Sequence, residues 1–212
     1  MNIVMHWPVA LVAGLAWAAL IATPASAQMD MAVMQKWMTV SVVRYAVVGE
    51  YAADTMVMNA GTNGYAPVKD RVEMTFDWDQ TEAKLVGVPM IKNFPSELGA
   101  IRNGAKGCRA PTLTGAYEHM SVLSLTPGLG GQLKMETRRD YPAASSPVAC
   151  TGGSQAVAAK SVTETQDFVV PGVMILAGPA AASGSVKVSA DRKSIISTDK
   201  GWTWTYTPTP VK

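Results

Sequence analysis

The chain is poor in the residue types that most often carry out chemistry in enzymes. It has 2 cysteines and 2 histidines among 212 residues, and His119 is the only histidine beyond residue 27. One histidine excludes a His-rich zinc site, and no Cys-x-x-Cys pair indicates a redox or metal-binding dithiol. No Gly-x-Ser-x-Gly motif surrounds a serine, and no glycine-rich loop leads into a helix pattern. The sequence therefore indicates neither a nucleophile elbow nor a phosphate-binding loop.

The chain also lacks any strong excess of charge of one sign. It has 18 Lys and Arg against 16 Asp and Glu, and both signs are mixed along the sequence. A nucleic-acid-binding protein would show a basic block or stripe, and none is present. Nucleic acid is therefore excluded as an expected partner.

The chain has no apolar run long enough for a comfortable membrane helix, but it has a shorter one near its start. This run extends from Val9 to Ala22 and is followed by Pro24 and the tripeptide Ala25-Ser26-Ala27. An apolar segment of this length before an Ala-x-Ala site is typical of a secretory signal peptide. We expect residues 1–27 to be a cleaved signal and residues 28–212 to form one periplasmic or secreted domain, with no membrane span after cleavage.

The sequence after the signal has the alternation of β-strands and very little helix pattern. From Arg71 to Trp78 every second residue is apolar, and the stretch Asp79–Glu82 then has the composition of a turn. Strands that follow one another without intervening helices favour an antiparallel arrangement over βαβ units. The aromatic content of 7% is low for the aromatic girdles of an outer-membrane barrel. We predict an all-β domain, a single antiparallel β-sandwich or β-barrel of about nine or ten strands; the alternation does not distinguish the two.

Two stretches, residues 89–112 and 142–154, interrupt the strand pattern and each contains one cysteine. In an oxidising compartment we expect Cys108 and Cys150 to form a disulfide that staples the longer loop. Closing a loop of this length stabilises the fold by roughly 4 kcal/mol in the chain-entropy model. We expect the two joined loops, with Arg109 beside Cys108, to form the main contact surface for a ligand or partner.

A second candidate ligand surface is the aromatic row near the C-terminus. Trp202, Trp204 and Tyr206 alternate with threonines, so in a strand the three rings share one face. Such a row can bind a sugar or stack on a partner, and inward-facing rings are equally typical of a core strand. Both interpretations stay open from the sequence.

Possible metal ligands occur in two places. Met29, Met31 and Met34 crowd the expected new N-terminus, and thioethers are ligands that select Cu(I), so copper is the one cofactor that the sequence suggests. Methionine also simply fills irregular apolar gaps. The carboxylates of residues 77, 79 and 82 lie near a turn, where they can bind a cation or serve glycoside chemistry, although acidic residues beside a turn are usually just solvated.

These observations favour a non-catalytic binding or accessory module that holds a protein, a glycan or an apolar ligand, rather than an enzyme. One alternative is a periplasmic carrier of an apolar small molecule or lipid, which a closed barrel with an internal cavity would reveal. A second is a Cu(I)-binding protein that uses the N-terminal methionines. The third and least favoured is a hydrolase, which would need the hydroxyl of Ser121 beside the ring of His119.

Overall fold

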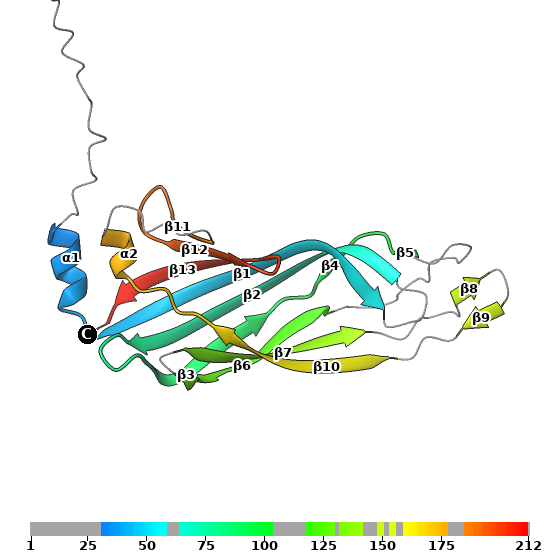
Figure 1. Cartoon of the computed structure of the whole chain (residues 1–212), viewed down its shortest axis with the longest axis horizontal. Coiled ribbons are helices and arrows are strands. Elements are labelled where there is room, and N and C mark those ends of the chain that lie inside the picture. The colour runs from blue at the N-terminus through cyan, green and yellow to red at the C-terminus, as the bar shows by residue number, and fades with distance from the viewer. Residues whose placement is uncertain are drawn as a thin grey trace, which may run out of the picture.

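The computed structural model of the chain describes residues 31–58, 64–103, 118–129, 132–141, 148–150, 153–155, 159–177 and 185–211. Two short helices and thirteen strands lie in these ranges (Figure 1). The helices are α1 (Met31–Met38) and α2 (Met174–Ala177). The strands are β1 (Val42–Met58), β2 (Gly64–Asp79), β3 (Lys84–Asn93), β4 (Glu97–Leu98), β5 (Arg102–Asn103), β6 (Met120–Pro127), β7 (Leu133–Tyr141), β8 (Val148–Cys150), β9 (Gly153–Gln155), β10 (Lys160–Phe168), β11 (Val186–Val188), β12 (Ile195–Asp199) and β13 (Trp202–Pro210).

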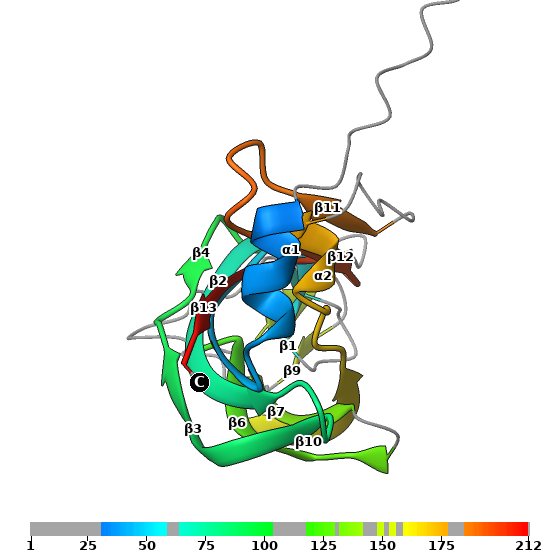
Figure 2. The ribbon, with the colours of Figure 1, turned by 90° about the vertical axis from the view of Figure 1, so that its left-hand side faces the viewer.

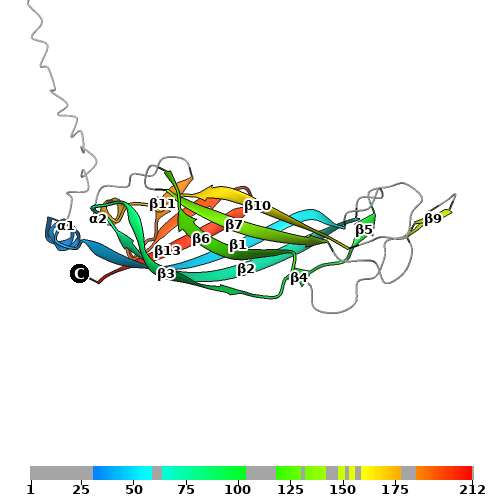
Figure 3. The ribbon, with the colours of Figure 1, turned by 90° about the horizontal axis from the view of Figure 1, so that it is seen from below.

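Two antiparallel sheets form the body of the domain. The larger sheet has eight strands in the order β11-β12-β13-β1-β2-β3, with β4 and β5 added beside β2, and the smaller has the order β10-β7-β6. The two sheets are not closed into a barrel. Seen from below, β6, β7 and β10 lie across the strands of the larger sheet (Figure 3). The fold is therefore the sandwich of the two predicted architectures, with the short hairpin β8–β9 at the end of the molecule opposite the helices (Figure 1).

The core lies between the two sheets and follows the predicted alternation. Along β2 the side chains of Val72, Met74, Phe76 and Trp78 are buried, while the residues between them are more exposed. They face residues of the smaller sheet such as Met135, which is fully buried. A strand with one face in such a core must alternate in this way because successive side chains point to opposite sides.

The two helices lie together at one end of the sandwich (Figure 2). Trp37 of α1 and Leu176 of α2 are buried in the core cluster. The composition of residues 36–48 and 173–177 predicts strands, and the structure corrects this prediction to helix for residues 36–38 and 174–177. Helix α1 extends to Met38 and α2 forms one helical turn. Because short apolar segments fit either state, their packing against the end of the sheets decides the outcome.

Strand β1 is longer than the sequence indicated. The composition of Tyr51–Met58 suggests a separate strand that pairs with the one before it, but this segment continues β1 through Gly49 without a turn. Because Gly49 has no side chain, an aromatic ring of β13 can pack on the β1 backbone at this point. A Cβ built there would lie within 2.9 Å of three atoms of the Trp204 ring, which packs directly on the β1 backbone. Glycine in a strand often marks such a close approach.

The predicted loop over residues 89–112 begins later than expected. β3 continues to Asn93, and two short strands, β4 and β5, follow it before residue 104. The pairing of β2 with β3 shifts register between Thr75 and Asp77, and Gly87 at the bulge has φ 74°. Pro89 is tolerated at this bulge because β3 is the last strand of its sheet. Counting such short strands also raises the number above the nine or ten expected.

Candidate functional site

A cavity of about 310 Å³ lies between the two sheets at the edge where they do not join. Its floor is apolar and buried, and Phe168, Trp204 and Tyr206 are all less than 6% exposed. Its mouth is polar and formed mainly by β10, β11 and β12. The lining residues are Met135, Gln166, Asp167, Phe168, Val169, Ser185, Val186, Ser197, Thr198, Asp199, Trp204 and Tyr206.

The floor is a cluster of aromatic rings in mutual contact. The Phe168 ring lies edge-on to Trp204 at 5.1 Å between centroids, and it tilts against Tyr206 at 5.8 Å. On the far side of Trp204 the ring of Trp202 stacks at 5.0 Å with an interplanar angle of 18°. With Gly49 beneath it and rings on both sides, Trp204 is held in one position, so the shape of the floor is fixed before any ligand enters.

Two buried tyrosines are anchored through their hydroxyl groups. Tyr206 donates to the carbonyl of Val169 at 3.3 Å, and Tyr45 donates to the carbonyl of Pro171 at 2.7 Å. Burial raises the pKa of Tyr45, and burial followed by the nearby Tyr45 and Asp199 raises the pKa of Tyr206. Both phenols therefore stay protonated across the physiological range, as donors that fix the segment after β10.

These raised pKa values predict alkaline unfolding with a defined sign. Above the ordinary tyrosine pKa of about 10 the unfolded chain loses these protons while the folded chain retains them, so the free energy of unfolding falls as pH rises. Each phenol contributes about 1.4 kcal/mol per pH unit there. We expect Tyr206→Phe to flatten this decline in denaturant titrations between pH 9 and pH 11. An unchanged slope would contradict the assignment.

The mouth carries two acidic side chains, Asp167 on β10 and Asp199 at the end of β12. Both are exposed. Asp167 forms an ion pair with Lys134. Within the described part of the chain Asp199 has no ion-pair partner, and it ends the strand whose Ser197 pairs with Trp204. The cavity therefore combines an apolar floor with a mouth of negative charge.

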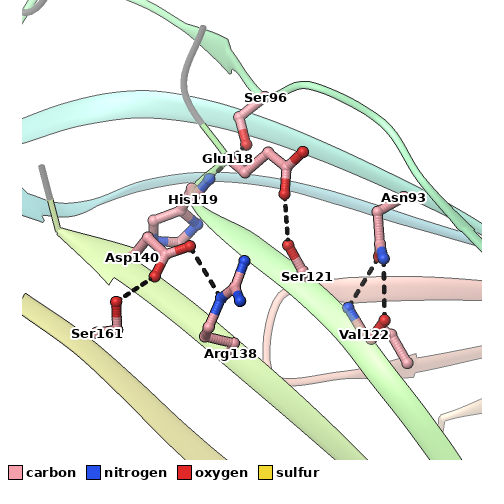
Figure 4. Close-up of polar contacts among 9 residues, drawn as sticks. All are labelled: Asn93, Ser96, Glu118, His119, Ser121, Val122, Arg138, Asp140 and Ser161. Atoms are coloured by element: carbon pink, nitrogen blue, oxygen red, sulfur yellow. Dashed lines mark hydrogen bonds and ion pairs between the residues drawn. The ribbon is translucent and has the colours of Figure 1, made fainter.

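A buried polar junction lies near the middle of the molecule, where the start of β6 meets the larger sheet. Nδ1 of His119 donates to Oδ2 of Asp70 at 2.7 Å, and Ser96 Oγ donates to Oδ1 of the same carboxylate at 2.5 Å. Ser96 Oγ also accepts the backbone N–H of His119 at 2.7 Å, as Figure 4 shows. His119 is 1% exposed and Asp70 is 4% exposed.

This junction is joined to the cavity by stacked rings. The His119 ring stacks on Tyr51 at 6.0 Å, and Tyr51 lies against Trp202 at 5.5 Å. Gly201, with φ 87°, permits this packing because a Cβ there would meet the Tyr51 ring at 2.8 Å. Contacting rings thus extend from His119 through Tyr51 and Trp202 to Trp204, and Asp70 positions the His119 ring at the first end of this series.

The side chain of Asn93 joins the two sheets beside this junction. Its amide nitrogen donates to the carbonyl of Val122 at 2.9 Å, and its oxygen accepts the Val122 N–H at 2.8 Å (Figure 4). One amide thereby takes the place of a strand ladder between β3 and β6 and satisfies both backbone groups. On β7, Asp140 accepts hydrogen bonds from Arg138 and Ser161, which ties β7 to β10.

The serine and histidine that a hydrolase would require are engaged elsewhere. The Ser121 hydroxyl donates to Glu118 Oε2 at 2.8 Å (Figure 4). The His119 Nδ1 faces Asp70. A serine nucleophile needs its proton directed at a base that a third group orients. Here the hydroxyl proton of Ser121 is directed at the carboxylate of Glu118, three residues away in the chain, and not at His119. This geometry therefore does not favour acyl transfer.

The predicted cation site near the β2–β3 turn is occupied by the protein's own groups. Asp77 accepts two hydrogen bonds from Arg44 at 2.7 and 2.9 Å, and this contact lowers its pKa. Asp79 accepts the backbone N–H groups of Thr81 and Glu82 at 2.8 and 2.9 Å, as an Asx turn does. Among the described residues no group of three or more His, Cys, Asp or Glu is arranged to hold a metal ion.

The structure describes only some of the methionines and cysteines singled out in the sequence. Met31 and Met34 lie on α1, and Met29 lies outside the described residues. Cys150 ends β8, while Cys108 and Arg109 also lie outside them. The disulfide, the copper site and the loop surface therefore stay predictions.

Of the aromatic row, Trp204 and Tyr206 line the cavity and Trp202 stacks behind them, so the row is both core and cavity floor. Sequence reasoning did not find Phe168, Asp199 or Gly49. Phe168 and Gly49 are far from Trp204 in the sequence, and no local spacing relates them to it. Asp199 is close in the sequence, at the end of the strand that forms a hairpin with β13.

A larger hollow, about 500 Å³, lies over β1 and β2, and five of its nine lining residues are charged. Its charged groups already pair with each other. Arg71 contacts Glu50 at 2.9 Å and Lys69 contacts Glu97 at 3.2 Å. We therefore regard the cavity between the sheets as the candidate site.

No helix in the described part of the chain has the length and apolar character to cross a membrane. Comparison of the chain with protein-family models, with curated proteins and with solved structures finds no match.

Proposed function

We propose that the protein is an exported, non-catalytic binding protein or carrier that takes up a small apolar ligand in the cavity between its two sheets. The observation that carries this proposal is the buried aromatic floor formed by Phe168, Trp204 and Tyr206 at an open edge of the sandwich. Small-molecule sites are typically concave and apolar, with a few polar groups that orient the ligand. This cavity has that composition.

The size of the cavity favours a small ligand. At about 310 Å³ it is at the lower end of the range for small-molecule sites, about 300–1,000 Å³. It has room for a short alkyl chain or a single ring system. The closed barrel that would reveal a carrier is not what the described strands form, since the sheets are not closed, and the cavity instead opens between the two sheets.

The rest of the molecule supports binding over catalysis. The buried histidine is oriented by Asp70 toward the core junction rather than toward the cavity floor, and Ser121 donates to Glu118. The groups at the mouth are hydroxyls, an amide and two carboxylates, which suit recognition of a polar end of a ligand.

Filling the cavity is expected to abolish binding without unfolding the protein. Val186 lines the cavity on the edge strand β11 and is only partly buried, and Lys187 beside it is exposed on the opposite face. We expect Val186→Trp to weaken the binding of 1-octanol by about tenfold or more, which corresponds to about 1.4 kcal/mol or more. Isothermal titration calorimetry at one temperature measures this directly.

The matched control is Lys187→Trp, which adds the same ring to the same strand on the outer face. It is expected to bind 1-octanol as the wild type does. Equal losses in the two variants, or no octanol binding by the wild type, would contradict the proposal. Circular dichroism of both variants checks that the strands are intact.

A further inference from the structure

We infer that the ligand of the inter-sheet cavity is a cationic amphiphile, with its apolar part on the Phe168, Trp204 and Tyr206 rings and its ammonium group at Asp199. This inference rests on the proposed function and specifies the class of ligand. The observations behind it are the charges at the mouth of the cavity and the aromatic floor beside them.

The charged side chains that line the cavity are both carboxylates. Lys134 pairs with Asp167 and offsets its charge. Asp199 forms no ion pair within the described ranges, so an incoming cation at Asp199 does not have to displace a protein partner. An incoming carboxylate or phosphate would instead be repelled by the negative charge of Asp199.

The position of Asp199 relative to the floor supports the same orientation of the ligand. Asp199 pairs in register with Trp202 in the β12–β13 hairpin, so its side chain lies on the same face of the sheet as the aromatic row. Trp204 and Tyr206 lie on β13, next to the strand that ends at Asp199. The charge of Asp199 also reaches this floor. After burial and the neighbouring Tyr45, it is a further cause of the raised pKa of the Tyr206 phenol. The same field stabilises a positive charge in the cavity.

Three amphiphiles with the same alkyl chain test the inference: octyltrimethylammonium, 1-octanol and octanoate, titrated by calorimetry at pH 7 into the full mature protein. We expect the ammonium compound to bind about three- to tenfold more tightly than octanol, and octanoate to bind least tightly. Asp199→Asn is expected to bring the affinities for the ammonium compound and for octanol close to equal, and this ratio, rather than the octanol affinity alone, is the readout. Glu164→Gln, an equal charge change at an exposed position of β10 outside the cavity lining, is the control and is expected to retain the preference.

The outcomes separate the two proposals. Binding of octanol as tightly as the ammonium compound overturns the cationic ligand and leaves the apolar cavity standing. A cation preference that survives in Asp199→Asn overturns the assignment of Asp199. Failure of all three compounds to bind overturns the proposed function itself, and the inference with it.

Discussion

Replacing Asp70 with alanine is expected to lower the free energy of unfolding by about 2–4 kcal/mol, because a buried hydrogen-bond donor left without its acceptor costs about 1–3 kcal/mol and Asp70 serves two donors. The carboxylate accepts from the His119 ring and from Ser96, and both Asp70 and His119 are almost fully buried. Without it, the buried His119 ring and the half-buried Ser96 hydroxyl lose their acceptor. A change of this size is a large fraction of the stability of an ordinary domain. Urea denaturation followed by circular dichroism measures it.

A surface carboxylate on the same strand provides the comparison. Asp77 also accepts two hydrogen bonds, from Arg44, but the arginine side chain is 54% exposed. We expect Asp77→Ala to unfold close to the wild-type midpoint because exposed pairs contribute little. Asp70→Asn keeps the shape of the side chain and one acceptor oxygen. Its loss of unfolding free energy should therefore lie between those of Asp70→Ala and Asp77→Ala. An Asp70→Ala variant as stable as Asp77→Ala would show that the junction does not hold the sheets together.

Gly49→Ala is expected to be the most damaging change near the cavity. The added Cβ would lie within 2.9 Å of three atoms of the Trp204 ring, and Trp202 and Phe168 limit its movement. Overpacking of this kind costs about 1–3 kcal/mol, and a ring held on both sides places the cost at the upper end. The displaced ring also alters the cavity floor, so 1-octanol binding should weaken together with stability.

Two comparisons isolate the clash. Gly172→Ala adds the same methyl group where nothing lies within 4 Å, and it should leave both stability and binding unchanged. Trp204→Phe replaces the indole with a smaller ring. Gly49→Ala should therefore lower the free energy of unfolding by less in that background than in the wild type. Additive losses in the double-mutant cycle would mean that Gly49 and Trp204 do not interact as described.

The parts of the fold that repeat locally could be predicted from the sequence. The alternation from Val72 to Trp78 and the row from Trp202 to Tyr206 both correspond to one buried strand face. The turn at Asp79 was also recognisable, since its side chain caps the backbone two and three residues on. Each of these features is determined by neighbours in the chain.

The candidate site could not be predicted in the same way because it is assembled across the sequence. Asp70 and His119 are 49 residues apart, and Asp70 and Ser96 are 26 residues apart, so no spacing rule relates them. Gly49 gave no sign of a close approach because its partner is on β13. The choice between sandwich and barrel also depended on contacts between distant edges, which strand alternation does not encode.

The central claim is that an apolar ligand enters the cavity between the sheets, and an NMR measurement tests it most directly. Isotope-filtered NOE spectra of the protein with ¹³C-labelled 1-octanol report which side chains contact the alkyl chain. We predict contacts from the chain to the ring protons of Phe168 and Trp204, and their loss in Val186→Trp. Contacts confined to the outer hollow around Phe94, or no contacts at all at saturating octanol, would contradict the account.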